Sequence, residues 1–410
     1  MSYQTHTLPS GLRIIHKHID TPVAYLGFGI GVGTRNESHL EYGIAHFMEH
    51  MLFKGTPRRS SMEIIELIEG VGGELNAYTS KEETMLYAVF PDQYVERALE
   101  LLCDIVQNSH FPEDELRKEQ TVVLDEISSY EDSPSDLIFD EFENMLFRGH
   151  SLGHNILGTD KSVSRFSSAR LKRFFSRYYQ PSNMILFSQG AIDFGLLISL
   201  TSEYLGEPSE KELSFAKPEC AAIFSPNSVR RLLRRRDTHQ RHVLIGGYAY
   251  PRHDSRRLAV SVLVNLLGGP SLNSRLNLAL RERTGFVYHV ECSYTAYADT
   301  GMISIYFGCA PSNMEQAIRL VEEELKRLVE APLTEEELEA TKRQLKGQLM
   351  VSHDNRETTF MSMGKNYLHH GRVDDLPDLV RRIDAVSAAQ LHEVAQDLLE
   401  PNKLHHLIYT

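Results

Sequence analysis

The clearest helical pattern of hydrophobic positions in the chain follows Gly43. Its apolar residues recur at three- and four-residue steps, at Ile44, Phe47, Met48, Met51 and Leu52. Residues spaced in this way share one face of an α-helix, so the pattern predicts a half-buried helix that is closed by Gly55. Polar residues within this helix must then lie together on one face.

The sequence predicts mainly short strands, and then helices, in the rest of the first half of the chain. Pro9-Ser10-Gly11 predicts a hairpin turn, and the β-branched and aromatic residues of 84–90 predict a strand. The predicted elements are a hairpin over 5–15, a strand over 23–32, a helix over 61–71, antiparallel strands over 74–79 and 84–90, and mainly helices from 91 to 147. The second half opens with a strand predicted over 242–250.

A long-period repeat relates the two halves. Tyr78-Thr79 followed by Thr84 aligns with Tyr294-Thr295 followed by Thr300 at one offset of 216 residues (294 − 78 and 300 − 84). A β-prone run, a proline and a helical pattern follow in both copies. The segment 206–229 is rich in Pro, Ser and charge and suits a linker. The sequence therefore predicts an α+β fold with two homologous domains, 1–205 and 230–410.

Composition excludes several classes of protein. With 410 residues, 41% of them hydrophobic and 24% charged, the chain has an ordinary globular composition. The N-terminal residues lack the pattern of a signal or transit peptide, and no apolar run approaches the roughly 20 residues of a membrane span. Four Cys without a CxxC pair predict no disulfide framework and a reducing compartment. We therefore expect a soluble cytoplasmic protein.

Net charge bears on the partners. The formal charge of −13 argues against nucleic acid as a bulk partner and is compatible with attraction for basic ligands. The run Arg230-Arg231-Leu232-Leu233-Arg234-Arg235-Arg236 is an exception. We interpret it as a solvated strand edge, with a basic binding patch as the alternative.

Three polar residues interrupt the helix predicted after Gly43. His46, Glu49 and His50 are three and four positions apart, so their side chains share one face. Two imidazoles at this spacing can reach one metal ion, while the carboxylate stands next to the water that the ion carries. Zinc bound in this way needs a third protein ligand and an open position. The alternative is that each His is an ordinary core residue.

Two carboxylates of the helix predicted over 115–131 are candidates for the third ligand. Glu119 and Glu126 are seven positions apart, so they lie on one stripe together with Val122 and Val123. A carboxylate on the apolar side of a helix is costly unless it is paired or bound to a metal. From spacing alone both residues qualify, and the alternative is a solvated or salt-bridged surface glutamate.

The second copy of the repeat lacks these polar residues. When the glycines that end the two helices are aligned, the residues at the positions of His46, Glu49 and His50 are Val260, Leu263 and Val264. The positions that correspond to the two carboxylates are Thr341 and Gln348, and neither is a usual zinc ligand. Metal binding is therefore predicted in the first copy only. His150 and His154 are also four apart, but the glycines beside them predict a turn rather than a second site.

On these motifs the chain resembles the pitrilysin-type, or inverzincin, zinc metallopeptidases, and above all the single-motif bacterial and mitochondrial-processing-peptidase branch. In that family the His-x-x-Glu-His helix is followed by the motif R-x-E-x-x-V-V-x-x-E-I, which here runs from Arg117 to Ile127. Glu126 follows His50 by 76 residues (126 − 50). The resemblance identifies His46, His50 and Glu126 as ligands of one zinc ion per chain.

The resemblance also implies roles for residues outside the metal helix. Residues 72–79 look like the family's G-G-x-x-N-A-x-T segment, whose edge strand pairs with the substrate backbone through Asn76 and Ala77. In the second half, Arg283 and Tyr288 match an Arg and a Tyr five apart that help to bind the substrate and to stabilise the reacting carbonyl.

The function implied by the resemblance is zinc-dependent hydrolysis of peptides or unfolded polypeptides inside a closed chamber. Glu49 is then the general base, and Glu119 is a carboxylate that supports a ligand. The family builds its chamber from four αβ-roll units, so a chain with two is expected to form a clamshell homodimer, or a heterodimer with a partner chain. The alternative is a non-catalytic structural or partner subunit of the same fold, which usually lacks motif residues that are present here.

Overall fold

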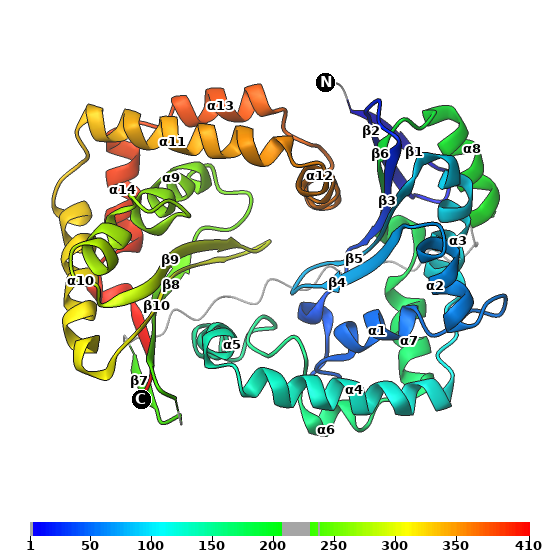
Figure 1. Cartoon of the computed structure of the whole chain (residues 1–410), viewed down its shortest axis with the longest axis horizontal. Coiled ribbons are helices and arrows are strands. Elements are labelled where there is room, and N and C mark those ends of the chain that lie inside the picture. The colour runs from blue at the N-terminus through cyan, green and yellow to red at the C-terminus, as the bar shows by residue number, and fades with distance from the viewer. Residues whose placement is uncertain (1–2, 207–229, 237) are drawn as a thin grey trace. The chain divides into compact units, whose positions relative to one another are not determined.

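The computed structural model describes residues 3–206, 230–236 and 238–410, which form two compact units (Figure 1). Unit 1 consists of the described residues within Met1–Ser128, His154–Glu219 and Ser352–Asp375. Unit 2 consists of those within Ser129–Gly153, Cys220–Val351 and Leu376–Thr410. Each half of the chain therefore supplies one segment to the unit that the other half mainly builds. The linker predicted over 206–229 lies, apart from Gly206, outside the described residues, and the predicted domain boundaries stay a prediction.

Unit 1 contains a six-stranded sheet with the strand order β1-β2-β6-β3-β5-β4. Its strands are β1 (Gln4–Thr7), β2 (Arg13–His18), β3 (Val23–Ile30), β4 (Glu74–Thr79), β5 (Thr84–Pro91) and β6 (Met184–Gly190). All neighbouring strands are antiparallel except β2 and β6, which are parallel. The predicted hairpin and the predicted antiparallel pair β4–β5 are confirmed. Strand β4 lies at the edge of the sheet, so its outer backbone groups have no neighbouring strand in unit 1.

The helices of unit 1 pack on this sheet and beside its edge. They are α1 (Ile44–Leu52), α2 (Ser61–Glu69), α3 (Val95–Asn108), most of α4 (Glu113–Glu131), α6 (Asp160–Val163), α7 (Ser168–Tyr178), α8 (Phe194–Leu205) and α12 (Arg356–His370). Helix α3 packs against β3 and β5, helix α12 against β3 and β6, and helix α1 against β4. The metal helix predicted after Gly43 is thus a neighbour of the edge strand.

Helix α12 comes from the second half of the chain and completes the core of unit 1. Its side chains Phe360, Met363 and Tyr367 are spaced by three and four residues and are buried against Phe187 and its neighbours in the sheet. The Phe187 and Phe360 rings stack with 4.4 Å between their centroids. Burying a side chain such as Phe360 contributes about 1.5–3 kcal/mol to folding.

Unit 2 contains a five-stranded sheet with the order β7-β11-β8-β10-β9. Its elements are α5 (Pro134–Leu146), β7 (Arg231–Arg234), β8 (Arg241–Ala249), α9 (Arg257–Gly268), the π-helix η4 (Asn277–Glu282), β9 (Val287–Ala296), β10 (Gly301–Cys309), α10 (Met314–Glu330), most of α11 (Glu335–Asp354), α13 (Leu376–Asp384), α14 (Ala388–Leu398) and β11 (His405–Tyr409). Helix α5 comes from the first half of the chain and packs on β8 and β11. The predicted α+β fold, with two mostly antiparallel sheets covered by helices, is confirmed.

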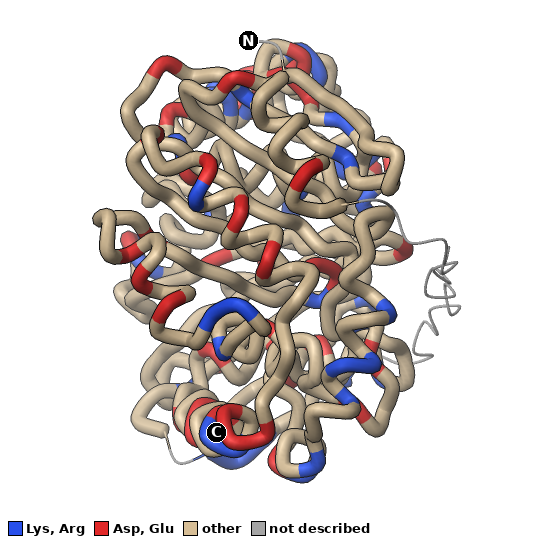
Figure 2. The backbone as a smooth tube through the Cα atoms, turned by 90° about the vertical axis from the view of Figure 1, so that its right-hand side faces the viewer, with Lys and Arg blue, Asp and Glu red and all other residues tan. Residues whose placement is uncertain are grey.

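The basic run is partly neutralised within unit 2. Strand β7 is an edge strand, as predicted, and it pairs with β11 in parallel. Glu141 of α5 accepts hydrogen bonds from Arg234 at 2.6 Å and from Arg236 at 2.8 Å. Acidic and basic residues are interspersed along the tube in Figure 2. The interpretation of the run as a strand edge is therefore confirmed.

Two further observations bear on the predictions from composition. The described cysteines, Cys103, Cys292 and Cys309, are free and buried, while Cys220 lies outside the described residues. Within the described ranges, none of the helices is both long and apolar enough to cross a membrane. The cytoplasmic location stays a prediction.

Candidate metal centre

Helix α1 presents the predicted polar triplet on one face. Its apolar residues Ile44, Phe47 and Met48 are fully buried in the core of unit 1. The opposite face of the helix is therefore directed towards α4. His46 is buried, whereas Glu49 and His50 are partly exposed. The two imidazole rings lie edge to face with 4.8 Å between their centroids. The i, i+4 spacing therefore places the two imidazoles side by side, as the sequence predicted.

Helix α4 brings one carboxylate to the imidazole nitrogens. Oε1 of Glu126 lies 3.7 Å from Nε2 of His46, and Oε2 of Glu126 lies 3.5 Å from Nε2 of His50. One ligand atom from each of these three residues can be chosen so that all lie within 4.8 Å of one another. Among the described residues, this is the one cluster of His, Cys, Asp and Glu with the spacing of a metal site.

The donor set fits zinc. Two imidazole nitrogens and one carboxylate oxygen are the ligands of many catalytic zinc sites, which leave a further position open for water or substrate. Burial and the neighbouring His50 lower the pKa of His46 to about 4, so this imidazole is neutral and can donate its lone pair to a metal. The close approach of His50, 3.5 Å away, lowers the pKa of Glu126 and keeps its carboxylate ionised.

Glu119 lies behind His50. Its Oε2 is 3.1 Å from Nδ1 of His50, and its Oε1 is 2.5 Å from Nζ of Lys54. With Nδ1 occupied in this way, Nε2 of His50 points towards Glu126 and the metal position. Burial opposes a charged imidazole, but hydrogen bonds to Glu119 and Glu126 raise the pKa of His50 to about 9. A zinc ion bound at Nε2 would replace the proton that this ring otherwise carries.

One detail of the prediction for α4 is wrong. Val123 is fully buried, but Val122 is 48% exposed, so the stripe that holds Glu119 and Glu126 includes only one of the two valines. The seven-residue spacing still aligns the two glutamates. The i+3 position lies on the border of the apolar face, and here it turns to solvent.

Glu49 stands beside the metal position with part of its carboxylate unoccupied. Burial raises the pKa of Glu49, while hydrogen bonds from Thr79 and the nearby His50 act in the opposite direction. Within the described ranges, the buried Oε2 of Glu49 has no hydrogen-bond partner. A buried acceptor without a partner is uncommon and costs about 1–3 kcal/mol. This carboxylate is thus free to accept a proton from a water or a substrate.

Two threonines and a tyrosine behind Glu49 escaped the sequence analysis. The hydroxyls of Thr79 and Thr84 lie 3.5 Å apart, and the hydroxyl of Thr84 donates to the backbone carbonyl of Val32 at 2.9 Å. Tyr179 is buried close enough to Glu49 and Thr84 for both to affect its pKa, which burial chiefly raises. Thr79 and Thr84 stood out in the sequence only as landmarks of the repeat and, for Thr79, as the end of the segment 72–79, and neither signal assigned them a role beside Glu49.

The two residues predicted to bind the substrate backbone lie on β4. Asn76 and Ala77 pair with Tyr87 and Leu86 of β5, so their other backbone edge faces away from the sheet. Side chains alternate along a strand, and Ala77 therefore shares the face of Thr79, whose hydroxyl lies 3.5 Å from the backbone oxygen of Ala45 in α1. The structure thus places this strand next to the metal helix.

Arg283 and Tyr288 belong to unit 2. Arg283 caps the C-terminal end of η4, and Tyr288 lies near the start of β9 with 85% of its surface exposed. The guanidinium carbon of Arg281 is 5.7 Å from the centre of the Tyr288 ring, so Arg281 is the arginine that contacts the tyrosine. The position of this pair relative to the metal centre stays a prediction.

The second copy of the fold contains a helix pair without metal ligands. Val260 and Leu263 of α9 are fully buried, and Val264 packs against the same core. On α11, Thr341 donates to the backbone of Glu337, and Gln348 donates to the hydroxyl of Ser271 at 2.8 Å. His150 lies in a turn, as predicted, and His154, which follows that turn, is paired with a carboxylate in unit 1.

Comparison with known proteins also distinguishes the first copy of the fold from the second. Residues 13–160 match the family model described as Insulinase (Peptidase family M16), and residues 165–345 match the model described as Peptidase M16 inactive domain. An uncharacterized zinc protease of Mycobacterium leprae is 34% identical over 96% of this chain and 88% of its own. The uncharacterized zinc protease YmxG of Bacillus subtilis is also 34% identical, over 96% of this chain and 95% of its own. The chain belongs to peptidase family M16.

Solved structures show the same fold. A protease from Helicobacter pylori matches with a TM-score of 0.94 and 21% identity, covering 100% of this chain and 99% of its own. A structure from Pseudomonas fluorescens described as a peptidase M16 inactive domain matches with a TM-score of 0.88 and 20% identity, covering 100% and 98%. The resemblance to the pitrilysin-type metallopeptidases that the sequence motifs indicated is confirmed at the level of family and fold.

Proposed function

We propose that the protein is a zinc-dependent endopeptidase that hydrolyses peptides or unfolded polypeptides. The observation that carries this proposal is the convergence of His46, His50 and Glu126 beside a carboxylate, Glu49, that has an unoccupied buried oxygen. Glu49 would have little reason to stand there in a purely structural site. The names of the relatives, which are zinc proteases, support the choice of metal and reaction.

The chain's own residues divide the work of hydrolysis. His46, His50 and Glu126 would hold the zinc, which supplies Lewis acidity towards a water and a peptide carbonyl. Glu49 takes the proton of the attacking water on its carboxylate and passes it to the nitrogen of the leaving amine. Glu119 keeps the imidazole of His50 in the orientation that presents Nε2.

The substrate would bind as an additional strand at the free edge of β4. Backbone hydrogen bonds to Asn76 and Ala77 read the peptide main chain more than its side chains, which suits extended or unfolded substrates. We further propose that Arg283 and Tyr288 bind the scissile carbonyl or its developing negative charge. This step needs a chamber, and we propose that a homodimer, or a heterodimer with a partner chain, provides it.

Metal analysis combined with a peptide assay tests the proposal. The purified chain should contain about one zinc per molecule, cleave a mixture of unstructured peptides, and lose both zinc and activity on treatment with a chelator. Added zinc should restore both. A chain that binds one zinc and cleaves none of the peptides would instead favour a non-catalytic subunit of the same fold.

A further inference from the structure

A buried carboxylate holds the start of the metal helix. Oε2 of Glu37 accepts a hydrogen bond from the backbone N–H of Gly43 at 2.8 Å, and Oε1 accepts one from the N–H of Ala45 at 2.8 Å. These N–H groups belong to the first turn of α1, where no preceding turn can supply an acceptor. The Glu37 side chain has 0% exposure. One side chain, sealed from solvent, thus fixes two backbone N–H groups of the first turn, directly ahead of His46.

The same carboxylate binds a loop that lies more than a hundred residues further along the chain. Nε2 of His154 lies 3.0 Å from Oε2 of Glu37. The His154 ring stacks on Tyr42 at 3.9 Å between centroids, with 12° between the planes. Burial lowers the pKa of His154 to about 4, so the ring is neutral and shares one hydrogen bond with the carboxyl group of Glu37. His154 is therefore a specific partner of Glu37.

The loop after His154 fits against the helix start without spare room. Gly43 has φ +90°, a conformation that glycine adopts readily, and a side chain there would place its Cβ 2.4 Å from the backbone oxygen of Leu157. Gly158 has φ +79°, and a Cβ there would lie 2.3 Å from the backbone oxygen of Tyr42. A shift of this loop would therefore push directly on the first turn of α1.

The turn that follows the substrate strand is attached to the same group of residues. Lys81, in the turn between β4 and β5, donates from Nζ to the backbone oxygen of His154. The backbone N–H of Thr34 donates to Ser80 at 3.1 Å, and that of Arg35 donates to Lys81 at 2.8 Å. The segment that carries Glu37 is thus hydrogen-bonded to the end of β4 as well as to the start of α1.

These contacts explain why a carboxylate is placed where burial is costly. Burial raises the pKa of Glu37, and the hydrogen bonds from Ala45 and Gly43 together with Lys81 only partly oppose this. An exposed Ser, Thr or Asp could cap a helix at smaller cost. Glu37 instead hydrogen-bonds to two segments, the metal helix and the loop at His154, and the charge of Lys81 in the turn after β4 also acts on it. Catalytic geometry is sensitive to displacements of about 1 Å between such segments.

We propose that Glu37, with His154, is a positioning residue that sets the metal helix α1 in register with Glu126 and with the substrate strand β4. The inference rests on the proposed peptidase function and adds a specific support for its metal site. Glu37 touches neither the ligands nor the substrate strand's free edge. Its effect passes through the first turn of α1, which carries His46, and through the turn at Lys81.

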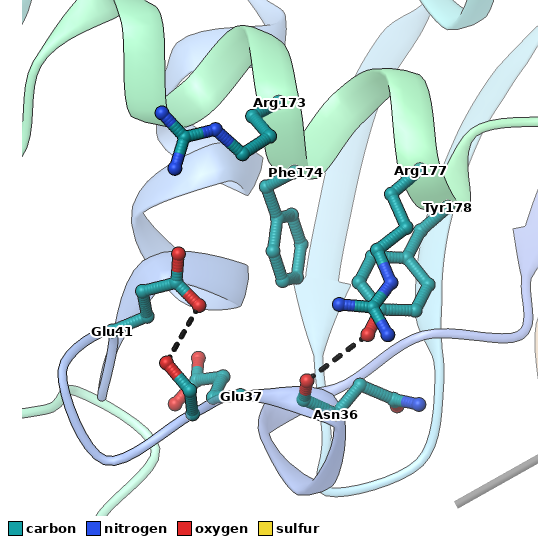
Figure 3. A pocket seen from close by; sticks show the side chains of 8 residues that line it. Asn36, Glu37, Glu41, Arg173, Phe174, Arg177 and Tyr178 are labelled. Atoms are coloured by element: carbon teal, nitrogen blue, oxygen red, sulfur yellow. Dashed lines mark hydrogen bonds between the residues drawn. The ribbon is translucent and has the colours of Figure 1, made fainter. Parts of the chain in front are cut away.

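The same loop offers a matched control. Glu41 lies four residues from Glu37, and its carboxylate accepts a hydrogen bond from the Ser38 hydroxyl at 2.8 Å. Figure 3 shows Glu41 at the rim of a cavity of about 280 Å³, on the side of the loop that faces α7. Glu41→Gln therefore changes the same chemical group in the same loop while leaving the contacts to α1 in place.

The experiment compares Glu37→Gln, His154→Leu, their double variant and Glu41→Gln. For each zinc-loaded chain, kcat, KM and the zinc dissociation constant are measured at a temperature where circular dichroism shows it folded. Glu37→Gln has one acceptor oxygen for two N–H groups, so we expect kcat to fall and zinc binding to weaken by about 10- to 100-fold. His154→Leu should have a smaller effect in the same direction. Because the two residues are in contact, the double variant should lose less than the product of the single losses.

Amide hydrogen exchange of 43–46 and 79–82 gives a readout that does not depend on activity. We expect exchange to rise in both segments in Glu37→Gln and in neither for Glu41→Gln. If the wild-type chain neither binds zinc nor cleaves peptides, the proposed function fails. Faster exchange of both segments in Glu37→Gln would still show that Glu37 connects the start of α1 to the turn after β4. A Glu37→Gln chain that keeps kcat, zinc affinity and exchange within twofold of wild type overturns the proposal, as does one that only melts at a lower temperature.

Discussion

Oε2 of Glu119 lies 3.1 Å from Nδ1 of His50, on the side of the imidazole opposite to Glu126. The two glutamates of one helical stripe therefore have different tasks. Glu126 reaches the metal position itself, while Glu119 and Lys54 hold a ligand from behind. Sequence spacing cannot distinguish the two, because residues seven apart lie on the same face of a helix.

This difference predicts unequal losses in two variants. Glu126→Gln removes a charged ligand and should abolish detectable zinc binding at stoichiometric concentrations. Glu119→Gln removes only the support of His50, and we expect zinc affinity to fall about 10- to 100-fold. Both constants can be measured by competition with a chromophoric chelator. Equal zinc retention by the two variants would contradict the assignment.

Thr79 should matter for the rate more than for metal binding. The hydroxyl and the backbone of Thr79 both oppose the rise in the pKa of Glu49, and Thr79→Val removes the hydroxyl's share, so the carboxylate is held less firmly beside the metal position. We expect kcat to fall about tenfold with unchanged zinc content. Thr79→Ser retains the hydroxyl and serves as the control, with kcat near that of wild type. Similar kcat values for Val and Ser at this position would show that the hydroxyl has no such role.

The docking of α12 onto unit 1 should depend on pH through Glu83. Although burial opposes its ionisation, His369 at 2.9 Å and Lys365 at 3.7 Å hold the pKa of Glu83 at about 2. Because this folded-state pKa lies below the unfolded value near 4.5, the contribution to stability is complete above about pH 4.5 and is lost as the pH falls towards 2.

Glu83→Gln should therefore lower the free energy of unfolding by about 1–3 kcal/mol at pH 7, and by less at pH 3. Denaturant unfolding of unit 1 at both pH values measures the difference. Glu69→Gln, which alters an exposed carboxylate of α2, is the control and should change stability little at either pH. A loss for Glu83→Gln that is the same at pH 3 and pH 7 would rule out the charge as its cause.

Mixed assemblies test whether two chains share an active site. Chains with Glu49→Gln retain Tyr288, and chains with Tyr288→Phe retain Glu49, so a shared site in a hybrid dimer would combine one intact metal centre with one intact tyrosine. We expect the mixture to recover part of the activity that each variant lacks alone. Hybrid formation is verified by mass spectrometry of the intact complex. Verified hybrids without recovered activity would contradict a shared site.

The sequence predicted those parts of the site that depend on local geometry. His46 and His50 are one turn apart, and Glu126 falls in a motif at a known distance from them, so helical periodicity and family resemblance were sufficient. The contact between Glu37 and His154 could not be predicted in this way. These residues are 117 positions apart, and they meet only because the loop after α5 packs on the start of α1.

The exchange of helices between the units also escaped prediction. The apolar stripe of α12 is an ordinary helical pattern, and nothing in it specifies the sheet of unit 1 as its partner. Likewise, nothing in the sequence marks Glu141 of α5, and it becomes a partly buried acceptor only because β7 and β11 meet it in unit 2. Such pairings depend on the packing of distant segments, which a periodic pattern does not encode.

The most direct test of the proposed function compares the wild-type chain with Glu49→Gln, purified in parallel and both loaded with zinc. Gln preserves the shape of the side chain but cannot accept the proton of the attacking water, so turnover should fall by about 10²-fold or more while zinc content stays near one per chain. Mass spectrometry of a mixed peptide library after incubation measures the new termini. New termini with the wild-type chain and almost none with Glu49→Gln are the result that we predict. Equal cleavage by both chains, or a parallel loss of zinc and activity in the variant, would contradict the role assigned to Glu49.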